Sequence, residues 1–247
     1  DGDWVRAKGT TLGADNGLGV ATMMAILESN SIEHPAIEAL FTIDEETGMT
    51  GAMGLEGGVL TGEILLNLDT EEDDEIGVGC AGGIDITATK KYIEVPAPED
   101  AITYNLTVKG LQGGHSGMDI IKGLGNANKF MNRFLLDGFE NYGLQIAEIN
   151  GGGLRNAIPR ESVAVFCIDE IHTEAFKADI AEFTETLKEE YKTLEPKLKV
   201  TLEEAPLPEK VMNLGVQEGL LKALQAAWNG VYRMSPDIEG LVETSNN

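Results

Sequence analysis

The order of apolar and polar residues divides the chain into two parts with different periodicity. In the first part, Leu18 to Glu28 is apolar on almost all sides and follows a Gly-rich turn, which predicts a buried helix. Two short apolar runs, 36–43 and 63–69, predict buried strands. A helix together with two buried strands indicates an α/β opening of the doubly wound type.

From Ile84 onward apolar and polar residues alternate, which is typical of half-buried antiparallel strands. The segments that we expect to form strands are 84–89, 101–109, 142–149, 162–168 and 198–202. Helical spacing predicts a helix after Ala127, a second with an apolar stripe from Phe176 to Leu194, and a last one between Leu220 and Trp228. No closing element is expected after this last helix.

A flexible glycine-rich stretch, 77–83, lies between the two parts and predicts a domain boundary there. The predicted fold class is therefore α/β. We expect part of a doubly wound domain at 1–83, followed by part of a smaller α+β domain at 84–247.

Charge and composition exclude several classes of function. The 247 residues contain 18 Lys and Arg but 42 Asp and Glu, a net charge of −24, whereas nucleic-acid binding requires a basic face. The chain has neither an apolar run of membrane-spanning length nor a signal-peptide pattern. Cys80 and Cys167 belong to no CxxC motif, so neither a zinc ribbon nor a disulfide framework is indicated. We expect a cytoplasmic protein without nucleic-acid or membrane partners.

Acidic residues stand at the ends of both predicted strands of the first part. The first strand stops at Asp44, Glu45 and Glu46. The second reaches Asp69, which is followed by Glu71, Glu72, Asp73 and Asp74. Ligands of open α/β sheets bind at the carboxyl ends of the strands, so these carboxylates predict a bound cation. If the chain stays extended, Glu45 and Glu46 point to opposite sides and have separate tasks.

Asp15 is a further candidate in the same part of the chain. Either Asp15 or Asn16 could cap the following helix. Alternatively, Asp15 faces the acids at the strand ends as a metal ligand. Carboxylates alone suit magnesium or calcium, whereas zinc usually takes imidazole or thiolate as well, so the spacing does not name the metal.

His115 differs from the other two histidines because glycines 113, 114 and 117 surround it. Such glycines let a backbone approach a ligand closely, although a plain turn would use them too. Ser116 is not expected to be a hydrolase nucleophile, because the GxSxG elbow is absent.

Six motifs occur in the order seen in a known family. They are TLGADNG (11–17), TIDEETGMTGA (42–52), LNLDTEE (66–72), KGLQGGHSGMDI (109–120), GLGNANKF (123–130) and GGGLRNAIPRE (151–161). Together they resemble the two-zinc exopeptidase family of aminoacylases, carboxypeptidases and dipeptidases, and most closely its members that act on Xaa-His dipeptides. The resemblance implies a zinc-exopeptidase catalytic domain, an inserted lid domain that forms a homodimer, and hydrolysis of a dipeptide substrate.

The resemblance also implies roles for the acids. Asp15 is similar to the carboxylate that bridges two zinc ions, and the Asp15–Asn16 bond to the family's cis peptide. Glu46 would bind one metal and Asp69 the other, with cobalt or manganese as alternatives to zinc. Glu45 resembles the general base that takes a proton from a metal-bridging water.

In the lid, His115 resembles the histidine that reaches the partner subunit's active site, and Asn156 the residue that holds the substrate's terminal carboxylate. The family's His-x-Asp motif and its last zinc histidine are not found in these 247 residues. We therefore expect a part of a longer protein that is inactive by itself. An aminoacylase-type or tripeptidase-type hydrolase, or a non-catalytic module kept for dimerisation, remain the alternatives.

Overall fold

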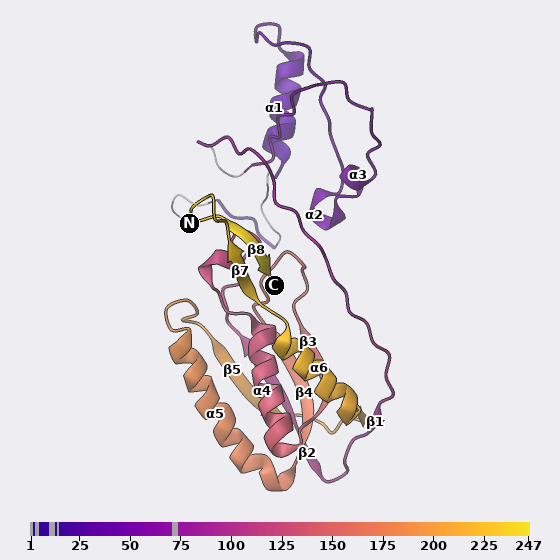
Figure 1. Cartoon of the computed structure of the whole chain (residues 1–247), viewed down its shortest axis with the longest axis vertical. Helices are drawn as coiled ribbons and strands as arrows, with labels where there is room; N and C mark the ends of the chain where they lie inside the picture. Colours follow the sequence, from indigo (N-terminus) through magenta and orange to yellow (C-terminus); the bar gives the residue numbers. More distant parts are fainter. Residues whose placement is uncertain (1, 3–4, 10–12, 14, 71–73) are drawn as a thin grey trace. The chain divides into compact units, whose positions relative to one another are not determined.

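A computed structural model describes residues 2, 5–9, 13, 15–70 and 74–247. The chain separates into two compact units, residues 1–82 and 83–247 (Figure 1). The division falls in the glycine-rich stretch at 77–83, next to the boundary predicted from the sequence.

The described part of the first unit contains three helices. They are α1 (Gly17–Glu28), α2 (Glu45–Gly48) and α3 (Thr50–Met53). The helix predicted after residue 17 is thus confirmed, but its predicted burial is wrong. Leu18 and Leu27 are 73% and 52% exposed, and only Gly19 of α1 is buried.

The N-cap hydrogen bond of α1 shows whether Asp15 or Asn16 caps the helix. The side-chain oxygen of Asn16 accepts a hydrogen bond from the Gly19 backbone N–H at 3.0 Å. Asn16 therefore satisfies an amide at the start of the helix, which leaves the Asp15 carboxylate available for other contacts.

The strands predicted at 36–43 and 63–69 are not formed, and this expectation was wrong. Within the described part of residues 1–82 no strand pairing occurs, and Ile64, Leu65 and Leu66 are about four-fifths exposed (82%, 80% and 79%). A strand requires hydrogen-bonding partners from elsewhere in the chain, and these runs have none within the unit. Hydrogen bonds connect the first run to the residues just before the second, because the Glu38 carboxylate accepts from both the Thr61 and Gly62 N–H groups at 2.8 Å.

The second unit is built on an antiparallel sheet in the order β3-β4-β2-β5. Its strands are β2 (Ala101–Lys109), β3 (Gln145–Gly151), β4 (Ser162–Asp169) and β5 (Lys199–Glu204). Two-stranded pairs form from β1 (Val95–Pro96) with β6 (Lys210–Val211) and from β7 (Gly230–Met234) with β8 (Val242–Asn246). The unit also contains the helices α4 (Ala127–Tyr142), α5 (Thr173–Glu190) and α6 (Leu214–Ala226), and the 3-10 turns η1 (Ile120–Lys122) and η2 (Glu170–His172).

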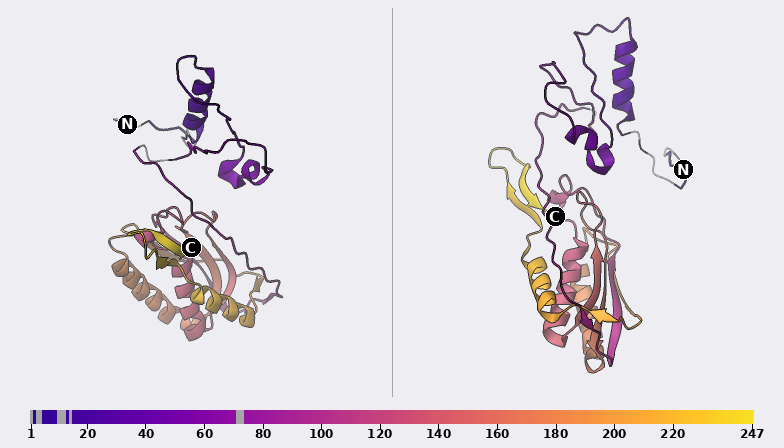
Figure 2. Two further views of the ribbon diagram at one scale, coloured as in Figure 1. Left: turned by 45° about the horizontal axis from the view of Figure 1, so that its top comes forward. Right: turned by 90° about the vertical axis from the view of Figure 1, so that its right-hand side faces the viewer.

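The three long helices cover one face of this sheet (Figures 1 and 2). Alternate residues of β2, namely Tyr104, Leu106 and Val108, are buried under them, as the period of two in the sequence predicts. Phe166 of β4 packs edge-on against Phe176 of α5, with ring centroids 5.5 Å apart. The core of the unit therefore lies between the sheet and the helices. On the opposite face Asn105, Val163 and Val165 are half-buried, whereas Thr103 and Cys167 are buried.

A buried amide fixes α6 against β3. The side chain of Gln217 is fully buried, donates from Nε2 to the Leu144 carbonyl and accepts at Oε1 from the Ile146 N–H, both at 2.7 Å. The pair of bonds satisfies both ends of the amide, so the contact sets the position of the helix without an unpaired polar group.

Three predictions for this unit were wrong in detail. Residues 84–89 are unpaired, with Ile84 and Ile86 each 89% exposed. Tyr142 belongs to α4, because Gly143 (φ +65) ends that helix and the strand begins only at Gln145. The chain also does not end at its last helix, because the β7–β8 hairpin follows. None of the helices among the described residues is both long and apolar enough to cross a membrane.

Candidate functional site

In the first unit, three of the predicted metal ligands approach one another. The Asp15 and Glu46 carboxyl groups are close enough to Asp69 for their charges to act on it. The pKa of Asp69 is raised, first by partial removal of its carboxyl group from water, then by the neighbouring side chain of Asp15 and by the charge of Glu46. The three acids come from the turn before α1, from α2 and from the extended 63–69 run.

This arrangement tests whether the residues fit a cation. Carboxylates that raise the pKa of a neighbouring acid favour a positive charge beside them, which a divalent cation could supply. The donor set is therefore suited to a hard or borderline cation. Among the described residues, no three His, Cys, Asp or Glu side chains are gathered tightly enough to hold a metal ion, so the three acids approach one another without forming a complete site. Glu71, Glu72 and Asp73 lie outside the described residues.

Glu45 and Glu46 form the first turn of α2, so the expected extended geometry is wrong. In a helix, successive side chains point about 100° apart, whereas in a strand they point to opposite sides. Asp44 accepts from the hydroxyls of Thr47 and Thr50, and these bonds hold the turn in which Glu45 stands. The peptide bond between Asp15 and Asn16 is cis, as the resemblance implies.

In the second unit, His115 and Asn156 stand on two neighbouring loop segments. His115 pairs with Ala157 in an isolated antiparallel bridge. The Ser116 N–H donates to the Asn156 carbonyl, and the Ile158 N–H to the Gly114 carbonyl, each at 2.8 Å. These backbone bonds keep the two predicted lid residues next to each other, although they are far apart in sequence.

Both residues line a depression of ≈ 960 Å³ in the second unit. Asn105, Val163 and Val165, on the sheet face opposite the helices, also line it. Asn156 is exposed. A depression of this size, partly apolar and edged by polar side chains, could accommodate a small peptide-like ligand.

A buried carboxylate that the sequence did not single out anchors the start of this loop. Glu195 is only 2% exposed and accepts from the Gln112 N–H at 2.7 Å and from the Gly125 N–H at 2.8 Å. Asp119, also missed, accepts from the His115 N–H at 2.7 Å. In the sequence, the position of Asp119 four residues after His115 was the available signal for the bond between them.

Comparisons with known proteins find relatives of both units. The family described as "Peptidase dimerisation domain" matches residues 106–195. The cytosol non-specific dipeptidase of Escherichia coli (strain K12) is 43% identical over 247 residues, which is 100% of this chain and 51% of that protein. The crystal structure of aminoacylhistidine dipeptidase from Vibrio alginolyticus is similar with a TM-score of 0.73 and 47% identity, covering 99% of this chain and 50% of that one. The chain thus spans about half the length of the relatives that it matches.

Proposed function

We propose that this chain, which is similar along its whole length to dipeptidases and matches a peptidase dimerisation domain at residues 106–195, is part of a metal-dependent dipeptidase. The observation that supports the proposal best is the approach of Asp15, Asp69 and Glu46, because three segments distant in sequence bring acids together there. A structural role would not require carboxyl groups to be placed where they repel one another.

In this proposal Asp15, Glu46 and Asp69 are the residues of this chain that would hold divalent metals. When bound, the metals, which we expect to be zinc, would polarise the scissile carbonyl and lower the pKa of the attacking water. Glu45 takes the proton from that water and passes it to the leaving amine. Glu45 is the neighbour of Glu46 in α2, so it lies next to a metal ligand but is not itself a ligand in this proposal.

The second unit would supply substrate contacts and the dimer. His115 donates a hydrogen bond to the oxygen on which negative charge develops, and Asn156 holds the terminal carboxylate of the dipeptide. The name of the Vibrio relative supports a substrate of the Xaa-His type, and that of the E. coli relative supports wider specificity and a cytoplasmic location. The dimerisation domain supports a homodimer.

A single substitution in the whole protein tests the proposal. Glu45→Gln removes the base but keeps the size of the side chain, so turnover of an Xaa-His dipeptide should fall by roughly 10²–10⁴-fold while bound metal is unchanged. Glu56→Gln, an exposed acid in the same unit, is the matched control and should retain full activity. A panel of Xaa-His dipeptides, N-acyl amino acids and tripeptides identifies the substrate class. Full turnover in Glu45→Gln would remove Glu45 from the mechanism.

A further inference from the structure

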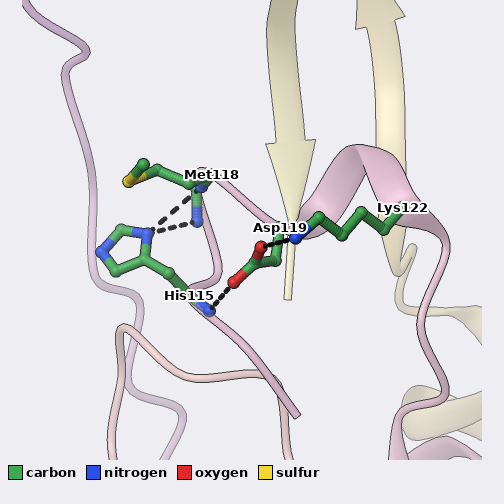
Figure 3. Close-up of polar contacts among 5 residues, drawn as sticks. His115, Met118, Asp119 and Lys122 are labelled. Carbon is green, nitrogen blue, oxygen red and sulfur yellow. Dashed lines mark hydrogen bonds and ion pairs between the residues drawn. The ribbon is translucent and has the colours of Figure 1, made fainter. Parts of the chain in front are cut away.

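The turn from His115 to Asp119 is closed by a reciprocal pair of bonds. The Asp119 N–H donates to the His115 carbonyl at 2.9 Å, and the His115 N–H donates to Asp119 Oδ2 at 2.7 Å. The other carboxylate oxygen, Oδ1, pairs with Lys122 at 2.5 Å (Figure 3). The pKa of Asp119 is lowered by the bond from Lys122 and then by that from the His115 amide. One carboxylate therefore fixes the backbone of the residue that carries the imidazole.

The same turn aims two amides at the His115 ring. Nδ1 accepts from the Gly117 N–H at 3.1 Å and from the Met118 N–H at 3.2 Å (Figure 3). A backbone amide can only donate, so Nδ1 must carry a lone pair. In the neutral ring the proton then sits on Nε2, and Nε2–H points away from the turn as a donor.

The surrounding residues leave space for this arrangement only if residue 114 is glycine. A Cβ at Gly114 would lie 2.7 Å from Asp119 Oδ2 and 2.8 Å from its Cβ. Any larger residue would push the carboxylate off the His115 amide.

We propose that Asp119 is a positioning residue, which holds His115 as the Nε2–H tautomer and directs that N–H toward the ligand. That His115 donates to a negatively charged oxygen rests on the proposed function. The tautomer and the orientation of the His115 ring do not rest on it. A donor fixed before the substrate binds costs no reorganisation during reaction, which is the condition for effective charge stabilisation.

The first test is nuclear magnetic resonance of the uniformly ¹⁵N-labelled 247-residue chain at alkaline pH. The His115 signals are assigned by their loss in His115→Gln. We expect a protonated Nε2 and a hydrogen-bonded Nδ1. In Asp119→Ala the Nδ1 signal should move toward that of a free ring, and the Gly117 and Met118 amides should exchange with solvent about tenfold faster, since a bond to a charged acceptor is lost.

Lys122→Ala is the matched control, because it removes the ion pair but keeps the carboxylate on the His115 amide. Its His115 signals should be unchanged. If Asp119→Ala does not fold, Gly114→Ala displaces the same carboxylate and should give the same spectral change. A protonated Nδ1 in the unmodified chain, or an unchanged His115 in the folded variant, would overturn the proposal.

In the whole enzyme, Asp119→Ala should lower kcat by up to about 10²-fold with little change in KM, and Lys122→Ala should not. The spectra separate this inference from the proposed function. If the protein lacks dipeptidase activity, the spectra should still show the Nε2–H tautomer of His115. If the protein is active but His115 does not adopt this tautomer, only the role of Asp119 is refuted.

Discussion

Replacing Glu195 by glutamine should destabilise the second unit, because its buried carboxylate accepts one backbone N–H on each oxygen. Glutamine offers one oxygen and turns an NH₂ group toward the other amide, so either Gln112 or Gly125 loses its partner. A buried donor left unpaired costs about 1–3 kcal/mol, and the remaining bond loses the assistance of a full charge. We expect the free energy of unfolding to fall by about 2 kcal/mol.

Urea unfolding followed by circular dichroism measures this loss, and amide hydrogen exchange at Gln112 and Gly125 localises it. The control is Glu189→Gln, whose partner Lys192 lies 2.5 Å away in a pair with side chains 75% and 66% exposed. Such an exposed pair contributes at most about 1 kcal/mol. If Glu195→Gln and Glu189→Gln lose the same stability, the carboxylate is not the anchor of the loop that carries His115.

Three further outcomes follow from the same structure. Mixing His115→Ala subunits with Glu45→Gln subunits of the whole enzyme should restore part of the activity if His115 acts in the partner's site, and no recovery after proven subunit exchange would place it in its own. Gly138→Ala should be less stable than Gly219→Ala by about 1–3 kcal/mol in thermal unfolding, since a Cβ at Gly138 meets Leu144 Cδ1 at 2.8 Å whereas Gly219 has open space; equal melting temperatures would show that the core adapts. The 247-residue chain alone should bind zinc weakly in calorimetry and hydrolyse no Xaa-His dipeptide, because the acids gathered in it lack an imidazole partner; tight binding would reveal other ligands.

The candidate site was predictable where a residue's role follows from its neighbours in sequence. The motifs group Asp15, Glu46 and Asp69 as expected ligands, and in the structure the charges of Asp15 and Glu46 act on Asp69; their role as ligands stays a prediction. The sequence alone could not decide whether Asp15 or Asn16 caps α1, because both side chains can accept hydrogen bonds from the same backbone amides. The choice required the bond from Gly19 to Asn16.

Sequence periodicity was sufficient for elements whose partners lie within the second unit. The strand at 101–109 has the predicted bounds, because its alternation matches a sheet with one covered face. The start of α4 follows from its Asn126 cap and apolar stripe, and its end from Gly143, which adopts the left-handed conformation. These signals are local, so they are present in the sequence.

Tertiary structure alone decided the rest. The apolar runs at 36–43 and 63–69 have strand-like composition, but pairing depends on a distant segment that composition does not specify. The contacts of Glu195 with Gln112 and Gly125 join positions about seventy or more residues apart, and no spacing rule connects them. The tautomer of His115 likewise depends on which backbone groups the folded turn aims at its ring, and only the path of the chain through space determines that.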